Sequence, residues 1–225
     1  MTSIGNAAFY DCSASEFDIP DSVAIIGKSA FAGCLDLKHI ELPDGIKVIR
    51  ENTFAETAIE NIKWPASLET IESWAFSMSY LKKLNFPNKL KSINENAFFE
   101  SSVEEIYIPA NVSLIDKTAF SRCDRIRVIE VAAGNNTYCA VDNALYLKDV
   151  TFLVRCPTAK TGKFIVPTSV VNIGAYAFEC SSYSSIVLPQ GLKNIGDMVF
   201  HGCFDLYAIN IPPSVQSISD TAFIG

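Results

Sequence analysis

The stretch LKHIELPDGIKVIRENTF, residues 37–54, decides the fold of this chain because its pattern returns along almost the whole sequence. Prolines recur 22 or 23 residues apart, with one longer gap, at Pro20, Pro43, Pro65, Pro87, Pro109, Pro167, Pro189 and Pro212. Six residues after each of these eight prolines stands an isoleucine, and eleven residues after each stands a phenylalanine. Together with Phe9, the eight positions eleven residues after a proline hold nine of the fifteen phenylalanines. Since a fixed period of this length is the signature of stacked repeats, we predict a solenoid.

Each repeat is expected to open with a strand. Apolar residues stand two apart before the proline, as in Ile106-Tyr107-Ile108, and this alternation is typical of a strand with one buried face. Proline then ends the strand because it has no N–H to donate. The segment that follows, up to the isoleucine, turns the chain back as a second short strand or a 3₁₀ turn. One such unit cannot close a core, so successive units must stack at about 4.8 Å and bury their like residues together.

The motif Ile-Gly-x-x-Ala-Phe resembles that of the BspA-like leucine-rich repeats. It stands at residues 26–31 and again at 173–178, and the first copy is followed by Cys34. The resemblance implies a repeat solenoid of the leucine-rich-repeat type, a right-handed superhelix that is mainly β with short strands and few or no regular helices. It also implies a secreted or cell-surface protein, typically bacterial, for which adhesion and binding of host proteins are the usual proposals.

The array is interrupted once, between Pro109 and Pro167. These prolines are 58 residues apart, 14 more than two regular units. The apolar runs 144–147 and 151–154, separated by a small polar turn, predict an inserted β-hairpin. The stretch 136–146 also resembles the irregular hairpin-bearing repeat of the same family, and this resemblance implies a turn at Asp142-Asn143, where Asn stands for the usual Gly and tolerates a positive φ. We therefore predict one continuous solenoid domain in three parts: regular coils over 1–131, an irregular repeat with the hairpin over 132–166, and regular coils over 167–225.

The charge balance argues against two classes of partner. The chain carries a net charge of -7, with 18 Lys and Arg against 25 Asp and Glu. Nucleic acid and anionic lipid both favour a basic surface, so neither is expected as the main partner. No apolar run approaches the roughly 18 residues of a membrane span, and no membrane insertion is expected.

The cysteines and histidines do not indicate an enzyme. Four of the seven cysteines stand three residues after one of the nine recurring phenylalanines, which we call the ladder phenylalanines. A tight turn favours small residues at this position, which is held by Cys12, Cys34, Cys123 and Cys203. An odd number of cysteines and the absence of any C-x-x-C argue against a disulfide framework and against zinc, although Cys12 and Cys34 in neighbouring coils could approach bonding distance. The one close Cys–His pairing is His201 with Cys203. We therefore predict no catalytic residue, no metal site and no cofactor.

The outward side of the strands that precede the prolines is the expected interaction surface, since solenoids present such a sheet as an extended platform. From Tyr107 onward this side becomes apolar in the sequence. The residues expected to be exposed and to bind a partner are Tyr107, Val128, Ile165, Val187 and Tyr207, with Ala208 exposed beside them. A contiguous exposed apolar stripe commonly marks an interface. The inserted hairpin, or further parts of a longer protein, could instead cover it.

We therefore predict a non-enzymatic module that binds protein, such as a host matrix or surface protein, or glycan. The alternative is a structural spacer in a larger cell-surface protein, with no ligand of its own. Neither end of the chain carries a polar cap in the sequence, so end-to-end self-association through the terminal coils is also expected to be possible.

Overall fold

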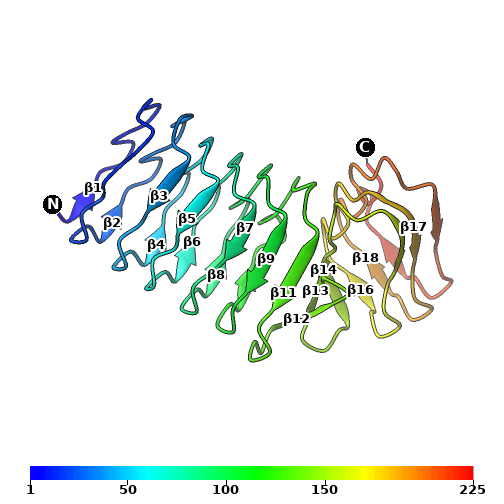
Figure 1. The fold of residues 1–225 in the computed structure, drawn as a ribbon. Coiled ribbons are helices and arrows are strands. Elements are labelled where there is room, and N and C mark those ends of the chain that lie inside the picture. Colours follow the sequence, from blue (N-terminus) through cyan, green and yellow to red (C-terminus); the bar gives the residue numbers. More distant parts are fainter. Residues whose placement is uncertain (225) are drawn as a thin grey trace. The chain divides into compact units, whose positions relative to one another are not determined.

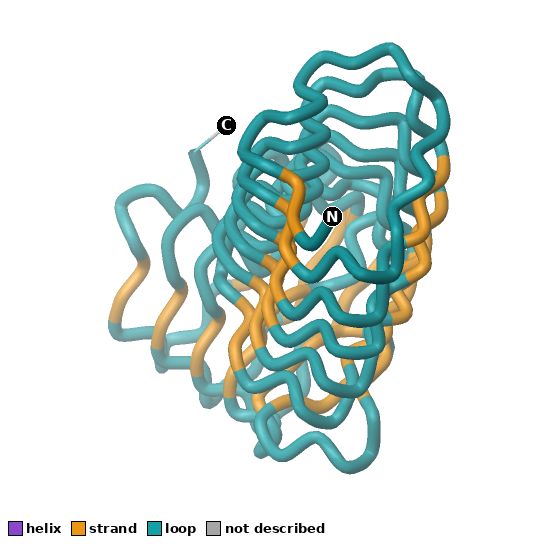
Figure 2. Tube along the Cα trace, turned by 90° about the vertical axis from the view of Figure 1, so that its left-hand side faces the viewer, coloured by secondary structure: helices purple, strands orange, loops and turns teal. Residues whose placement is uncertain are grey.

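A computed structural model describes residues 1–224 and divides the chain into two compact units, residues 1–123 and residues 124 onward. Each unit is a β-solenoid built from short strands and turns, and the described residues contain no helix (Figures 1 and 2). The predicted fold class is thus confirmed. The divisions predicted at residues 131 and 166 remain predictions.

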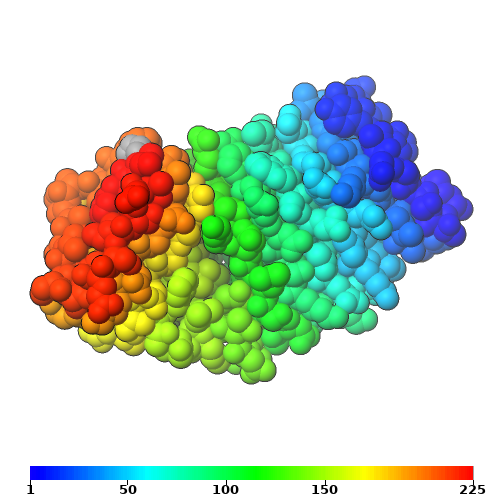
Figure 3. Space-filling view, turned by 180° about the vertical axis from the view of Figure 1, so that it is seen from behind, coloured from blue at the N-terminus to red at the C-terminus, as the bar shows by residue number. Residues whose placement is uncertain are grey.

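The first unit contains two rows of parallel strands (Figure 1). The strands that end before the prolines are β3 (His39–Glu41), β5 (Asn61–Lys63), β7 (Lys83–Asn85) and β9 (Glu105–Ile108); β3 pairs with β5, and β7 with β9. The strands that end at the ladder isoleucines are β1 (Ser3–Ile4), β2 (Ile25–Ile26), β4 (Val48–Ile49), β6 (Thr70–Ile71), β8 (Ser92–Ile93) and β10 (Leu114–Ile115). The segment left open between strand and 3₁₀ turn is therefore a two-residue strand. In Figure 3 the coils of this unit follow one another as bands from blue to green.

The second unit continues both kinds of strand. Before the prolines lie β15 (Gly162–Ile165), β17 (Tyr183–Val187) and β19 (Ala208–Asn210), which pair in parallel, and β11 (Val128–Val131) precedes them in the chain. The other row contains β12 (Tyr138–Val141), β13 (Ala144–Leu147), β14 (Phe152–Arg155), β16 (Asn172–Ile173), β18 (Asn194–Ile195) and β20 (Ser217–Ile218), in that order. Leu153, Ile173, Ile195 and Ile218 are register partners, so Leu153 holds the isoleucine position of the irregular coil.

The irregular repeat contains two antiparallel connections. Strands β13 and β14 pair across the turn 148–151, and β12 pairs with β13 across Asp142-Asn143. Asp142 and Asn143 have φ of 52° and 67°, which matches the two positive φ values of a type I′ hairpin turn. Strand β12 does not alternate between buried and exposed residues, and it was not recognised from the sequence because Cys139 and Ala140 are weak strand signals.

The phenylalanine ladder, Phe9 and the phenylalanines eleven residues after each proline, is the centre of both cores. In the first unit, Phe31, Phe54, Phe76 and Phe98 are fully buried, with neighbouring rings stacked at centroid distances of 5.3–5.4 Å. In the second unit, Phe178 stacks on Phe200 at 5.6 Å. Because each ring covers the next, a single repeat is stable only within a stack.

A cross-coil hydrogen bond from a cysteine fixes the turn after three of the ladder phenylalanines. We call the residue three places after the ladder phenylalanine the turn position. At three turn positions a cysteine Sγ donates to the carbonyl of the ladder phenylalanine one coil earlier. These bonds run from Cys34 to Phe9 at 3.1 Å, from Cys123 to Phe98 at 3.0 Å and from Cys203 to Phe178 at 3.0 Å. Thr57 and Ser101 donate to the phenylalanine of their own coil instead. Cys34, Cys123 and Cys203 therefore act as hydrogen-bond donors between coils.

Candidate functional site

The strand face of the second unit places two of the predicted residues side by side. We use this name for the outward side of β15, β17 and β19. Ile165, Val187 and Asn210 are register partners across these strands, and Lys163, Ser185 and Ala208 form the next row. Ile165 is 64% exposed, whereas Val187 and Ala208 are half-buried. Both were expected to be exposed and are only partly so, because in-register neighbours about 4.8 Å apart cover part of each other's side chain.

Tyr207 lies directly before β19 and is 81% exposed. Its amide donates to the carbonyl of Ser184, the residue before Ser185 in the neighbouring strand, at 3.1 Å. The backbone of Tyr207 is therefore held while its ring stays free. A ring in this state loses little conformational entropy on binding, since an aromatic side chain has only two rotatable bonds.

The remaining two predicted residues are less prominent. Val128 in β11 is half-buried, and Ile129 beside it donates its amide to Asn143 of the β12–β13 turn at 3.2 Å. The hairpin thus contacts β11, while Ile165 stays exposed. Tyr107 belongs to the first unit, where it is 37% exposed and pairs in register with Asn85.

The strand face of the first unit, the outward side of β3, β5, β7 and β9, is charged. Glu41 lies 3.4 Å from Lys63 Nζ and 3.7 Å from His39 Nε2, and Lys83 Nζ lies 2.9 Å from Glu105. All these side chains are more than 45% exposed, and exposed pairs of this kind contribute at most about 1 kcal/mol each to stability. Along this face the charged side chains thus pair with one another.

A groove of about 1420 Å³ lies at the N-terminal end of the first unit. One wall is the segment 13–21 and the other is the segment 36–45, with Lys63 beside it. Its charged lining residues are Glu16, Asp18, Asp21, Asp36, Lys38, His39, Glu41, Asp44 and Lys63. The groove forms because the first coil has no strand where later coils have β3 and β5.

This groove was not predicted from the sequence, although a signal for it was present. The first repeat has Ala14 and Phe17 where the second has Leu37 and Ile40. Phe17 packs on Phe9 and Phe31, with both centroid distances at 4.9 Å, and so replaces a strand residue by a ring in the ladder. A departure from the repeat at two core positions was the available signal.

His201 and Cys203 are not arranged as a catalytic base and its thiol nucleophile. His201 Nδ1 lies 3.6 Å from Glu179 Oε1, while Cys203 Sγ donates to Phe178 and lies 3.4 Å from Ser181 Oγ. Burial raises the pKa of the Cys203 thiol, which keeps it protonated and a poor nucleophile. The arrangement suits a structural turn.

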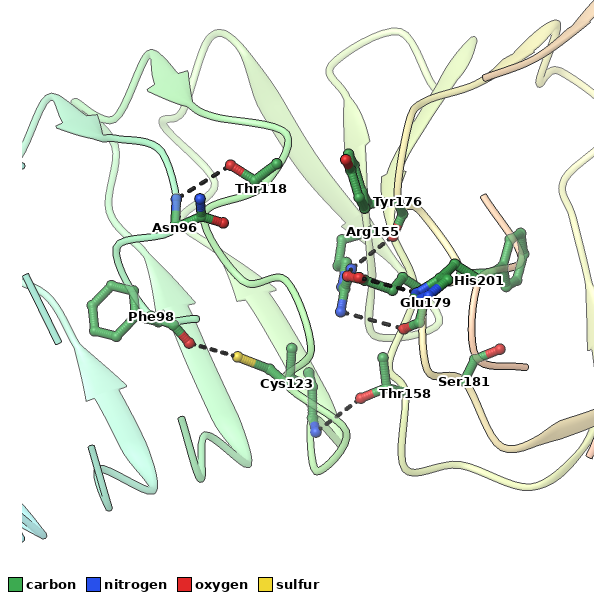
Figure 4. A network of polar contacts seen from close by, with 12 residues as sticks. Asn96, Phe98, Thr118, Cys123, Arg155, Thr158, Tyr176, Glu179, Ser181 and His201 are labelled. Carbon is green, nitrogen blue, oxygen red and sulfur yellow. Dashed lines mark hydrogen bonds and ion pairs between the residues drawn. The ribbon is translucent and has the colours of Figure 1, made fainter. Parts of the chain in front are cut away.

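A buried ion pair joins two coils of the second unit (Figure 4). Arg155 Nη1 lies 3.4 Å from Glu179 Oε2 and donates to the carbonyl of Tyr176 at 2.6 Å, and both charged side chains are under 5% exposed. Glu179 also faces His201, which is one-third exposed. This arrangement resembles a small charge network, but its groups lie inside the fold and are not placed to meet a substrate.

Over residues 1–224 no group of three or more His, Cys, Asp and Glu side chains is placed to hold a metal ion. The same residues form no helix that is long and apolar enough to span a membrane.

Solved structures of leucine-rich repeat proteins are similar to this chain, including the following three. A leucine-rich repeat protein from Eubacterium ventriosum is 22% identical with a TM-score of 0.73, covering 91% of this chain and 65% of that one. The pneumococcal vaccine antigen PcpA is 22% identical with a TM-score of 0.68, covering 95% and 57%. A leucine rich cell surface protein from Faecalibacterium prausnitzii is 25% identical with a TM-score of 0.64, covering 100% and 74%. The chain spans less than two thirds of the first two structures.

No curated protein matches the chain. The BspA type leucine rich repeat region matches it in six copies, over residues 2–127 and 154–225. The unmatched internal segment, 128–153, contains the β12–β13 hairpin. The matched segments carry the recurring isoleucines and the phenylalanine ladder, and leucine-rich repeats generally serve as interaction modules. The chain belongs to the family of BspA-type leucine-rich repeat proteins.

Proposed function

We propose that the chain is a non-enzymatic interaction module that binds a protein or glycan partner through the strand face of the second unit. The observation that supports this proposal is the arrangement of Ile165, Val187 and Tyr207. Two β-branched side chains stand next to each other in register, and a ring that is 81% exposed lies at the next strand. Apolar and aromatic side chains at such a position are the usual anchors of an interface.

The surroundings of these residues also favour contact with a partner. Lys163, Ser185 and Asn210 lie around them and offer hydrogen-bond donors and acceptors. An apolar centre with a polar rim is the common anatomy of an interface. Tyr107 on β9 and Val128 on β11 are proposed as additional contacts.

We place the protein at the surface of a bacterial cell or outside it, with adhesion as its role. The support is the family, together with the resemblance to a structure described as a leucine rich cell surface protein. The alternative, a spacer with no ligand, is favoured by the strand face of the first unit, whose charges pair with one another.

A binding screen tests the proposal. The purified chain is applied to immobilised matrix proteins and to a glycan array, and each captured partner is measured again with Ile165→Lys, Val187→Lys, Tyr207→Ala and Tyr107→Lys. The matched control is Gln216→Lys, which adds the same charge at an exposed place beside β20 in the other strand row. The proposal predicts at least a tenfold loss of affinity for Ile165→Lys and no change for the control. Equal binding by all variants would reject the strand face, and capture of no partner would support the spacer.

A further inference from the structure

Two cysteines stand at the turn position of adjacent coils at one place in the described chain. Cys12 and Cys34 follow the ladder residues Phe9 and Phe31, whose rings stack at 5.2 Å. The amide of Asp11 donates to the carbonyl of Ala32 at 2.8 Å, which fixes the two turns side by side. The two cysteines are thus held in neighbouring coils by backbone contacts on one side and by ring stacking on the other.

Their atoms meet at a shared acceptor. Cys34 Sγ lies 3.1 Å from the carbonyl oxygen of Phe9, and the amide of Cys12 donates to the same oxygen, also at 3.1 Å. Cys34 Sγ is therefore directed at the backbone of Cys12, although the two residues form no disulfide in this structure.

Other coils show how close side chains at this position come. Ser101 Oγ lies 3.4 Å from Cys123 Sγ, and Ser181 Oγ lies 3.4 Å from Cys203 Sγ. In both pairs the side chains of two consecutive turn positions are in contact. With cysteine at both positions the same geometry brings two sulfurs into contact, and adjacent coils have the Cα spacing that a disulfide requires.

The segment that follows Cys12 is weakly attached. In the structure as described, the backbone of residues 13–19 makes no hydrogen bond to the second coil, whereas His39–Glu41 in that coil pairs fully with β5. Packing of Phe17 on Phe9 and Phe31 is the main tertiary contact of this segment. The same segment is one wall of the N-terminal groove, and the other wall begins just after Cys34.

We propose that Cys12 and Cys34 are a redox-active pair that a low-molecular-weight disulfide oxidises to an intramolecular disulfide, which ties the wall of the N-terminal groove to the second coil. The pair lies at the base of both walls, so the bond limits how far segment 13–21 can move from segment 36–45. The inference is independent of the strand-face proposal, which concerns the second unit.

The reaction proceeds by thiol–disulfide exchange. Cys12 is half-buried and Cys34 is fully buried, so the oxidant reaches Cys12 first. The Cys12 thiolate attacks one sulfur of the small disulfide and expels one small thiolate. Cys34 then loses its proton and attacks Cys12 Sγ, which releases the second small thiol. Two electrons pass from the two thiols to the small disulfide, and the two protons end on the released thiols. Burial raises the pKa of the Cys34 thiol, which lowers the fraction of thiolate available for the second step.

Oxidised glutathione is the probe for the test. The chain is incubated with it at pH 8, the remaining thiols are alkylated under denaturing conditions, and the protein is digested without reduction and analysed by mass spectrometry. We expect a cross-linked peptide containing Cys12 and Cys34, a loss of about 2 Da from the intact mass, and two fewer alkylated thiols. Cys34→Ser should stop at the first step and retain one glutathione on Cys12, and Cys12→Ser should form no cross-link.

Serine is a suitable replacement because Ser79, Ser101 and Ser181 hold the same position in other coils. Ser101→Cys tests the geometry separately, since it places a second cysteine 22 residues before Cys123, and it should gain a second disulfide.

Glutathione retained on Cys12 of the wild-type chain without the cross-link, or a cross-link from Cys12 to another cysteine, would overturn the pairing. Cleavage after Glu16, in the wall itself, by a glutamate-specific protease should slow at least fivefold on oxidation of the wild type and not of Cys12→Ser; unchanged cleavage would overturn the tether.

Discussion

Cys156 occupies, one coil earlier, the place that Phe178 holds in the phenylalanine ladder. The amide of Cys156 donates to the carbonyl of Ala177 at 2.8 Å, as the amide of Phe178 donates to the carbonyl of Val199 at 3.0 Å. The thiol is fully buried, and Tyr146 and Tyr183, buried in the same apolar cluster, lie near it. A small side chain at a ladder position is thus accommodated by two large rings.

This arrangement predicts a loss of stability at alkaline pH. Burial raises the pKa of Cys156, Tyr146 and Tyr183, so folding favours their protonated forms. Their contribution is complete below the ordinary thiol pKa of about 8.5 and decreases as the pH rises above it. The urea midpoint should therefore fall between pH 7 and pH 10, and less steeply in Cys156→Ala. An unchanged wild-type midpoint over this range would contradict the prediction.

The phenylalanine ladder predicts a large loss of stability for Phe98→Ala. This ring is fully buried and stacks on both Phe76 and Phe120. Removal of a buried phenylalanine ring costs about 3–5 kcal/mol of unfolding free energy, measured by urea denaturation. The control Tyr80→Ala, in the same unit but 57% exposed, should change it by less than about 0.5 kcal/mol. Similar costs for both variants would mean that the ladder is not the core.

Two glycines of the first unit should differ in their tolerance of alanine. A Cβ at Gly27 would lie 2.4 Å from the amide nitrogen of Asn6 and 2.5 Å from the carbonyl carbon of Gly5, both backbone atoms of the first coil. A Cβ at Gly45 meets no atom within 4 Å. We expect Gly27→Ala to lower the unfolding free energy by about 1–3 kcal/mol. Thermal denaturation of both variants checks this, and equal melting temperatures would contradict it.

The buried pair Arg155–Glu179 predicts strong coupling between two substitutions. Glu179→Gln leaves a guanidinium that is 4% exposed without its carboxylate, which costs about 3–5 kcal/mol. Arg155→Met together with Glu179→Gln should cost less than the sum of the single variants, because no buried charge remains. In the exposed pair Glu41–Lys63, the substitution Glu41→Gln should lower the unfolding free energy by less than about 1 kcal/mol. Additive costs in urea denaturation would show that the buried charges act independently.

Much of the fold followed from the sequence because a repeat multiplies each weak signal. One Phe eleven residues after one Pro predicts little, but eight such pairs in phase predict stacked rings, as Phe54 and Phe76 show. Deviations from the repeat were harder to interpret. Phe17 and Cys156 stand where the pattern has other residues, and only packing shows that Phe17 joins the ladder beside Phe31 and that Tyr146 and Tyr183 lie near Cys156.

The sequence by itself determined the solenoid, the positions of its strands and its buried ladder, since these depend on periodic local pattern and on like residues meeting in successive coils. The tertiary structure alone decided the degree of exposure of Val187 beside Ile165, the contact of Arg155 with Glu179, and the approach of Cys34 to the backbone of Cys12. These features depend on distances between residues in different coils. Periodicity specifies which residues are neighbours, whereas side-chain packing specifies how closely they approach and how much solvent they still meet.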